Sequence, residues 1–308
     1  MAELLYGKPA ADALTAETRR RADMLRGKNV LPKLVILRCG ENEADGAYIR
    51  GAMKRGGLCG VDVELRTLAE NVFADGLARA LEAVNSDNGI HGCLLLRPLP
   101  GHLKAMESKL CALLDPKKDV DGMTPVSAAG VFTGSGEGFA PCTAQACMAL
   151  LDYYGVDCAG KIATVVGRSA VVGRPAAMLL LARNATVTVC HTGTRDVAAV
   201  TRLADIIVTA AGAAGSLTAD HVRPGQVVVD VSTNWSGASL CGDAVFDDVS
   251  RIVEAITPVP GGVGAVTSAV LMAHTVRAAE GCLLTCLHLP RRRPTMRPQA
   301  WSRHNTRR

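Results

Sequence analysis

Residues 161–175, KIATVVGRSAVVGRP, decide the fold, because they combine a strand, a glycine turn and a helix start in immediate succession. Residues 162–166 are mostly apolar and β-branched, as in a buried strand. Gly167 and Gly173 let the backbone approach a ligand, and Pro175 suits the first turn of the following helix. Since the N–H groups of a helix start attract anions, the stretch predicts a site for the phosphates of a dinucleotide.

The spacing of this turn separates it from two common phosphate motifs. Ser169 stands where the fingerprint G-x-G-x-x-G has its second glycine, and Gly173 follows Gly167 by six residues. No Gly-Lys-Ser/Thr follows, which excludes a P-loop. Two interpretations of the turn alone stay open: a nucleotide site, and a strand-to-helix turn with a purely structural role.

The composition is that of a globular protein. The chain has 308 residues, room for two domains, with 48% hydrophobic and 20% charged residues. It contains no run of about 18 apolar residues. The first residues, MAELLYGKPAADAL, carry charges and a proline where a signal peptide would be apolar, so we expect a cytoplasmic protein. Eleven scattered cysteines without Cys-x-x-Cys predict reduced, buried thiols and no metal site.

The positive net charge comes entirely from the C-terminal end. Residues 291–308 hold seven arginines and no acidic residue, while the whole chain has 34 basic and 29 acidic residues. Such a composition without apolar periodicity predicts a disordered tail over 289–308. The tail could contact nucleic acid through phosphates, but no aromatic platform or nucleic-acid module accompanies it, so a solvated tail is the favoured interpretation.

Helical and strand patterns alternate along the chain, which predicts an α/β fold with parallel sheets and two domains. The first series ends near residue 140, the second occupies 141–264, and a last helix at about 265–285 folds back to complete the first domain. The expected helices are 9–27, 45–58, 76–86, 143–154, 174–183 and 195–203, and the expected strands are 31–40, 61–68, 90–100, 161–166, 185–190, 204–212 and 226–232.

Ligands of doubly wound sheets lie outside the carboxyl ends of the strands. That rule selects Gly40, 97–100, 167–169, 191–194, Ala211, Gly212, Ser232 and Thr233. The strand at 185–190 continues into HTGTR without the acidic residue that NAD-specific folds place on the ribose, and Arg168 or Arg195 could meet a 2′-phosphate. NADP is therefore favoured over NAD. The structural alternatives are a surface salt bridge for Arg168 and a helix N-cap for Thr194.

Five blocks together resemble the bifunctional methylenetetrahydrofolate dehydrogenase/methenyltetrahydrofolate cyclohydrolase family. The blocks are PKKDVDGMTP (116–125), FAPCTAQACMALL (139–151), VVGRSAVVGRPAAMLLLARNATVTVCHTGT (165–194), ADIIVTAAG (204–212) and ITPVPGGVGAVTSAVLMAHT (256–275). The resemblance runs from about residue 3 to 280. It implies a catalytic, folate-binding domain over 1–140, a Rossmann NADP-binding domain over 141–264, a folate cleft between them and a homodimer.

The resemblance also implies the site residues. Tyr48 would border the folate, Asp121 would hydrogen-bond the pterin, and the 258–264 loop would line the cleft. The expected set is Tyr48, Lys54 and Asp121 for catalysis, Gly167, Arg168, Ser169, Thr192 and Thr233 for the cofactor, and Tyr48, Leu96, Pro98, Asp121, Pro260, Gly261 and Gly262 for the substrate. Three of these assignments have a purely structural alternative. Tyr48 could be a core residue, Asp121 could form a turn, and the 258–264 loop could be a rigid connector.

Two positions depart from the family pattern. The family's catalytic lysine follows the tyrosine by four residues, but position 52 is alanine and Lys54 is the nearest candidate. Residues i and i+4 differ by ~40° around a helix, while i and i+6 differ by ~240°. Leu96 stands where the family has glutamine, with Arg97 beside it.

The two half-reactions depend on these positions differently. The folate nitrogen drives transfer of hydride to the nicotinamide, so the protein mainly positions two ligands. Hydrolysis of the methenyl product needs an acid/base group, whose loss typically removes ~10²–10⁴ in rate. We expect dehydrogenase activity with weak or absent cyclohydrolase activity. A folate-binding protein without turnover and another two-domain enzyme, such as a shikimate dehydrogenase, are the alternatives.

Overall fold

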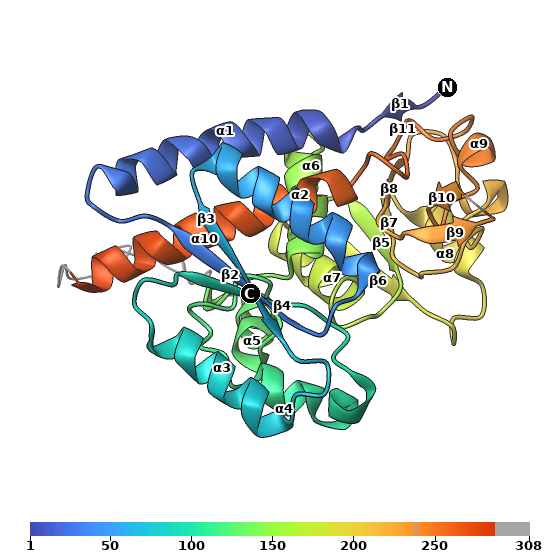
Figure 1. Ribbon diagram of the computed structural model, residues 1–308. Helices are drawn as coiled ribbons and strands as arrows, with labels where there is room; N and C mark the ends of the chain where they lie inside the picture. Colours follow the sequence, from blue (N-terminus) through green and yellow to red (C-terminus); the bar gives the residue numbers. More distant parts are fainter. Residues whose placement is uncertain (238, 287–308) are drawn as a thin grey trace, which may run out of the picture.

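The computed structural model describes residues 1–237 and 239–286, and these form two α/β halves around two parallel sheets (Figure 1). The predicted fold class is confirmed. The expected tail at 289–308 lies outside the described residues, as does the side chain of Cys286. No helix within the described part of the chain is long and apolar enough to cross a membrane.

The first half is built on a parallel sheet with the order β3-β2-β4. Helix α3 shows why these residues fold together: Leu77, Leu81 and Val84 share one face and are buried against Val35 and Leu37 of the central strand. The elements are α1 (Gly7–Arg26), β2 (Lys33–Cys39), α2 (Glu43–Cys59), β3 (Asp62–Leu68), α3 (Ala74–Ser86), β4 (Gly92–Leu95), η1 (Gly101–Met106), α4 (Glu107–Cys111) and α5 (Pro125–Thr133).

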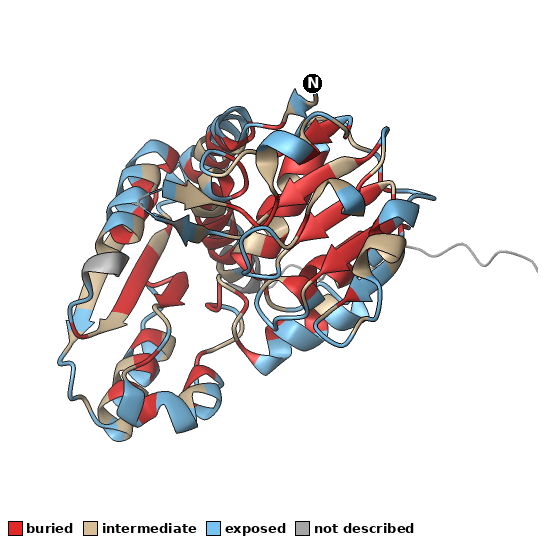
Figure 2. Cartoon of the chain, turned by 90° about the vertical axis from the view of Figure 1, so that its right-hand side faces the viewer, coloured by how far each residue is buried: buried red, intermediate tan, exposed pale blue. Residues whose placement is uncertain are grey.

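The second half is a six-stranded sheet with the order β1-β11-β8-β7-β5-β6, in which every pair is parallel. Figure 2 shows that its strands are mostly buried, while the outer helices expose one side. The elements are α6 (Cys142–Tyr153), β5 (Ile162–Val166), α7 (Gly173–Ala182), β6 (Thr186–Cys190), α8 (Val197–Leu203), β7 (Ile206–Thr209), η2 (Ala219–His221), β8 (Val227–Asp230), β9 (Asn234–Ser236), β10 (Ser239–Cys241), α9 (Phe246–Val249) and β11 (Ala255–Ile256).

The N-terminus crosses between the halves. Strand β1 (Glu3–Leu4) pairs in parallel with β11, so it extends the sheet of the second half although its residues open the first. Neither two-residue strand has a pattern of its own, because two residues are too few for periodicity. The chain therefore enters the first half only after Tyr6, where α1 begins.

The expected helix near 265–285 is present as α10 (Gly264–Cys286), and it runs beside α1 in Figure 1. Arg21 on α1 and Glu280 on α10 form an ion pair of 2.5 Å. Val266, Leu271 and Met272 are fully buried between the helices. The last helix thus packs on the first, across almost the whole length of the sequence.

One capping assignment differs from expectation. The Thr194 hydroxyl accepts a hydrogen bond from the backbone N–H of His191 at 3.0 Å and caps no helix. The cap of α8 is Asp196, whose carboxylate accepts from the N–H of Ala199 at 2.8 Å. Both residue types suit a cap, and the turn 191–194 is closed by Thr194 before the helix starts.

Candidate functional site

The glycine turn after β5 is packed against its neighbours without room for side chains. A Cβ on Gly167, whose φ is +120°, would lie 2.2 Å from the carbonyl oxygen of Ala210, and one on Gly173 would lie 2.2 Å from that of Gly167. Ser169 accepts hydrogen bonds from the N–H groups of Val172 and Gly173 at 3.1 and 3.2 Å. The backbone of β5, its turn and the start of α7 therefore form one rigid cradle.

The other expected cofactor residues lie on neighbouring loops at the same sheet edge. Arg168 follows β5, Thr192 follows β6 and Thr233 follows β8, and all three are exposed. Their strands are parallel, so their carboxyl ends meet at one edge. The order β7-β5-β6 puts the change of winding direction beside β5, where a doubly wound sheet binds its ligand.

A cavity of about 360 Å³ opens beside this edge. One wall is the end of β8, from Asp230 to Thr233, and the other is the 258–265 segment with the expected Pro260, Gly261 and Gly262. The segment is held by α1, because the N–H of Gly7 donates to the carbonyl of Gly261 at 2.8 Å. The cavity therefore unites the expected Thr233 with the glycine-rich loop.

The first half contributes a second group of polar side chains. Asp121 follows the first sheet and lies near Cys142, where α6 begins, and the Cys142 thiol donates to the carbonyl of the adjacent Val120 at 3.3 Å. Nη2 of Arg97 lies 3.8 Å from Oδ2 of Asp121. Burial raises the pKa of Asp121, although Arg97 and Cys142 act in the opposite direction. The carboxyl group thus sits at the start of a helix beside a fixed cation.

Tyr48 lies close to this carboxyl group on α2. Burial, followed by the nearby Cys142 and Asp121, raises the pKa of Tyr48, so its hydroxyl stays protonated at neutral pH. Tyr48 and Leu96 both pack against the core that contains Ala52. The structure thereby brings together the expected Tyr48 and Asp121, while Leu96 packs against the same core and Pro98 is exposed on the adjoining segment.

Lys54 does not join this group. Its side chain is exposed, while Ala52, one turn after Tyr48 on the same face of α2, has no exposed surface. The structure therefore does not bring Lys54 to Tyr48, because two more residues along the helix carry its side chain to another face; its catalytic role stays a prediction. The cation beside Asp121 is Arg97, which the sequence marks only by its position next to Leu96.

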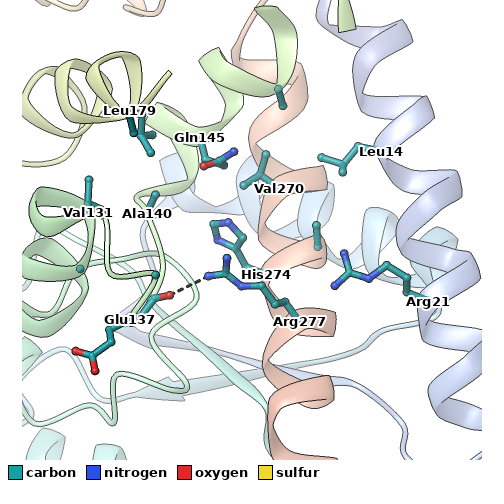
Figure 3. A pocket seen from close by; sticks show the side chains of 17 residues that line it. Leu14, Arg21, Val131, Glu137, Ala140, Gln145, Leu179, Val270, His274 and Arg277 are labelled. Atoms are coloured by element: carbon teal, nitrogen blue, oxygen red, sulfur yellow. Dashed lines mark hydrogen bonds between the residues drawn. The ribbon is translucent and has the colours of Figure 1, made fainter. Parts of the chain in front are cut away.

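A second cavity, of about 370 Å³, lies between α1, α6, α7, α10 and the 134–140 segment (Figure 3). Its lining includes Gln145, His274 and Arg277 but none of the expected site residues. His274 is held by the carbonyl of Val120 at 2.9 Å, and burial lowers its pKa to about 4. Among residues 1–237 and 239–286, no group of three metal-ligating side chains comes together.

The comparisons with known proteins agree over most of the chain. Residues 5–121 match the family model "Tetrahydrofolate dehydrogenase/cyclohydrolase, catalytic domain", and residues 141–283 match the NAD(P)-binding domain of the same family. A curated relative, bifunctional protein FolD of Carboxydothermus hydrogenoformans, is 46% identical over 283 residues, which cover 91% of this chain and 98% of the relative.

Solved structures of similar proteins have the same fold. The bifunctional FolD enzyme of Campylobacter jejuni superposes with a TM-score of 0.87 at 36% identity, over 91% of this chain and 99% of that one. The methylenetetrahydrofolate dehydrogenase-cyclohydrolase of Trypanosoma brucei, solved with NADP and an inhibitor, superposes with a TM-score of 0.84 at 32% identity, over 92% and 98%.

Proposed function

Since the chain belongs to the tetrahydrofolate dehydrogenase/cyclohydrolase family, we propose that it oxidises 5,10-methylenetetrahydrofolate with NADP and hydrolyses the methenyl product weakly or not at all. The family acts in one-carbon metabolism on tetrahydrofolate derivatives, as an oxidoreductase and a hydrolase. The preference for NADP over NAD and the weak or absent hydrolysis of the methenyl product go beyond family membership and are what this proposal adds.

The nucleotide site supports NADP. The cradle of Gly167 and Gly173 would lose its shape with any side chain, and α7 begins directly at it, so the positive end of the helix dipole suits phosphates. The turn after β6 has no acidic residue between His191 and Arg195 to bind a ribose 2′-hydroxyl. Arg168 and Arg195 are exposed beside this turn, and their guanidinium groups suit a 2′-phosphate.

The folate site supports the oxidation step. A bound nicotinamide would accept a hydride, with the electron pair of the breaking C–H bond, from the methylene carbon of the folate, and the folate nitrogen lone pair would stabilise the methenyl cation that remains. The protein's part is to orient the two ligands. Asp121 can accept from pterin N–H groups, and the protonated Tyr48 can donate a hydrogen bond beside it. Arg97 adds a permanent positive charge within 3.8 Å of Asp121.

The observation that carries the second part of the proposal is the absence of an acid/base group at position 52. Hydrolysis requires protons to move at the reacting centre, but Ala52 is wholly buried and Leu96 packs against the same core. Arg97 does not replace a lysine here, because a guanidinium remains protonated and cannot accept a proton. The site keeps its binding groups and loses its proton carrier.

Two assays on the purified protein test the proposal. With 5,10-methylenetetrahydrofolate we expect steady NADPH formation, and NAD should be used at least ~10-fold less efficiently in kcat/KM. With methenyltetrahydrofolate we expect hydrolysis ~10²–10⁴ below that of a family enzyme with the lysine, assayed in parallel. Stoichiometric folate binding without NADPH formation would favour a folate-binding protein without turnover. Hydrolysis at the reference rate would refute the second part.

We also propose a homodimer in the cytosol. Phe132, Leu181 and Val189 expose 74%, 54% and 37% of their surface on α5, α7 and the edge strand β6, and such apolar side chains suit an interface between two copies. The nine cysteines from Cys39 to Cys241 form no disulfide bond with one another, as suits a reducing compartment. Light scattering at micromolar concentration should give twice the mass of one chain, and a monomer would refute the dimer.

A further inference from the structure

A buried carboxylate, Asp243, lies beneath the carboxyl edge of the six-stranded sheet and has no exposed surface. It accepts hydrogen bonds from three consecutive backbone N–H groups of the loop after β7: Ala211 at 2.7 Å, Gly212 at 3.3 Å and Ala213 at 2.8 Å. Three N–H groups converging on one carboxylate fix the segment 210–215, AAGAAG, which has no side chain longer than a methyl group.

The same carboxylate holds the loop after β8. Ser232 Oγ donates to Asp243 at 2.7 Å and Asn234 Nδ2 donates at 3.1 Å. Ser232 Oγ also accepts from the N–H of Gly212 at 3.1 Å, which links the two loops directly. Thr209, inside strand β7, donates at 2.9 Å. Asp243 therefore joins two loops that come from different strands.

A second buried carboxylate, Asp230, holds Asp243 in place. It accepts from the N–H groups of Ser232, Asp243 and Ala244 at 3.2, 3.1 and 2.8 Å. The chain passes so close that a Cβ on Gly242 would lie 2.0 Å from Oδ2 of Asp230. Asp230, Ser232 and Thr233 line the 360 Å³ cavity, so this network ends at the surface of the candidate site.

The network determines what the first loop can offer a ligand. The N–H groups of residues 211–213 are directed to Asp243, and residues 210–215 have no polar side chain. Residues 211 and 212 therefore offer a ligand their backbone carbonyls, which accept from hydroxyl and amide donors and repel phosphates. A ribose or carboxamide, not a pyrophosphate, is the ligand group that suits this loop.

We propose that Asp243 is a positioning residue for the pyridine nucleotide, which joins the loops after β7 and β8 into one surface that receives the ribose and nicotinamide. This inference rests on the proposed function, because it assumes that a pyridine nucleotide binds at this sheet edge. Asp243 touches no reacting atom in this arrangement and acts through the backbone of the two loops.

The test compares Asp243→Asn with the unchanged protein and with Asp205→Asn. Asparagine keeps the shape but offers one acceptor oxygen, so the N–H groups on its amide side lose their partner. Asp205 is a matched control: its carboxylate also holds a strand, accepting from Ile162 N–H at 3.0 Å, but at the opposite edge of the sheet. Calorimetry measures the Kd of NADP, and steady-state kinetics measure kcat and both KM values.

We expect Asp243→Asn to raise the Kd and KM for NADP by roughly 10–100-fold, with kcat at saturating NADP and the KM for methylenetetrahydrofolate within ~3-fold. Asp205→Asn should change the Kd of NADP by less than ~2-fold. A Kd for Asp243→Asn equal to that of the unchanged protein would overturn the inference, as would an equal loss in Asp205→Asn. If the unchanged protein binds no NADP, the proposed function itself is refuted, which distinguishes that outcome from a failure of the inference on Asp243 alone.

A second pair of variants covers the case in which Asp243→Asn does not fold. Ser232→Ala removes the hydroxyl that links the two loops, while Thr209→Val removes a donor that comes from the strand. We expect Ser232→Ala to raise the Kd of NADP by roughly 5–20-fold and Thr209→Val by less than ~2-fold. Equal effects of the two variants would mean that Asp243 serves the strand and not the cofactor loops.

Discussion

At the scale of single residues, the group around Tyr48 and Asp121 has two distinguishing features. No lysine stands at position 52, and Arg97 pairs with Asp121. Because the angle between positions on a helix follows from the sequence, the helix spacing alone indicates that Lys54 lies on another face of the helix than Tyr48, although Lys54 belongs to the expected catalytic set. The pairing of Arg97 with Asp121 could not be derived in that way. It depends on where two loops from different strands meet.

Restoring the missing groups should restore hydrolysis. In Ala52→Lys with Leu96→Gln, we expect methenyltetrahydrofolate hydrolysis to rise by at least ~10², because an amine and an amide return to the side of Tyr48. The rate is read from the loss of methenyltetrahydrofolate absorbance. Lys54→Ala is the control and should leave both activities within ~2-fold. A large loss in that control would show that the exposed lysine reaches the substrate after all.

Buried His274 should make the protein acid-sensitive. Its pKa is lowered to about 4 by burial, below the unfolded value of 6.5, so its contribution to stability is full above pH 6.5 and is lost as the pH falls toward 4. The full loss is about 3 kcal/mol. Asp230 acts in the opposite direction, since burial raises its pKa to about 6 and its contribution grows as the pH falls.

The comparison with His274→Asn isolates this histidine, because asparagine keeps an N–H for the carbonyl of Val120 and does not titrate. The free energy of unfolding of both proteins is measured by urea denaturation from pH 7 to pH 4.5. The stability of the unchanged protein should fall relative to the variant over this range. Parallel curves would contradict the assignment of a buried neutral histidine.

At the scale of elements, long periodic segments agree with the sequence analysis and short ones do not. The expected helices and strands of both series are present within a few residues of their predicted ends. The hairpin β9 and β10, strands β1 and β11 and helix α5 were not predicted. Strands of two or three residues show no period, and their pairing is decided by the neighbouring strand.

The contact of α1 with the glycine-rich loop should be sensitive to one methyl group. A Cβ on Gly7 would lie 2.0 Å from the carbonyl oxygen of Gly262, so Gly7→Ala must push the loop away from the helix start. We expect the free energy of unfolding to fall by about 1–3 kcal/mol and the Kd of NADP to rise several-fold. Urea denaturation and calorimetry measure the two effects.

Gly51→Ala on α2 is the matched control for Gly7→Ala. Its added Cβ would meet no atom of the described residues within 4 Å, so it should raise the stability by roughly 0.5–1 kcal/mol through helix propensity. If Gly7→Ala and Gly51→Ala change stability alike, the close approach of α1 to the loop does not restrict residue 7.

At the scale of the whole molecule, the two ends of the described chain hold the halves together. Helix α10 leaves the glycine-rich loop and packs on α1, while β1 extends the sheet of the second half. Each half is therefore completed by a segment that lies far from it in sequence. The halves should unfold together.

Truncation after Val263 tests this dependence. The truncated chain lacks α10, whose fully buried side chains would each have contributed about 1.5–3 kcal/mol, a sum that reaches the stability of a typical protein. These side chains are Val266, Leu271, Met272 and Val276. We expect the cooperative thermal transition followed by circular dichroism to disappear. Truncation after Cys286 is the control and should keep the transition, and a Tm preserved in both chains would contradict the argument.

The sequence by itself determined the alternation of strands and helices, the glycine turn at Gly167 and the family, because these depend on residues that are close together in the chain or on blocks that keep their order. Only the tertiary structure decided that Arg97 meets Asp121 and that Asp243 joins two loops. The physical reason is that these contacts connect distant segments, whose separation is set by the packing of whole strands and helices and by no local pattern.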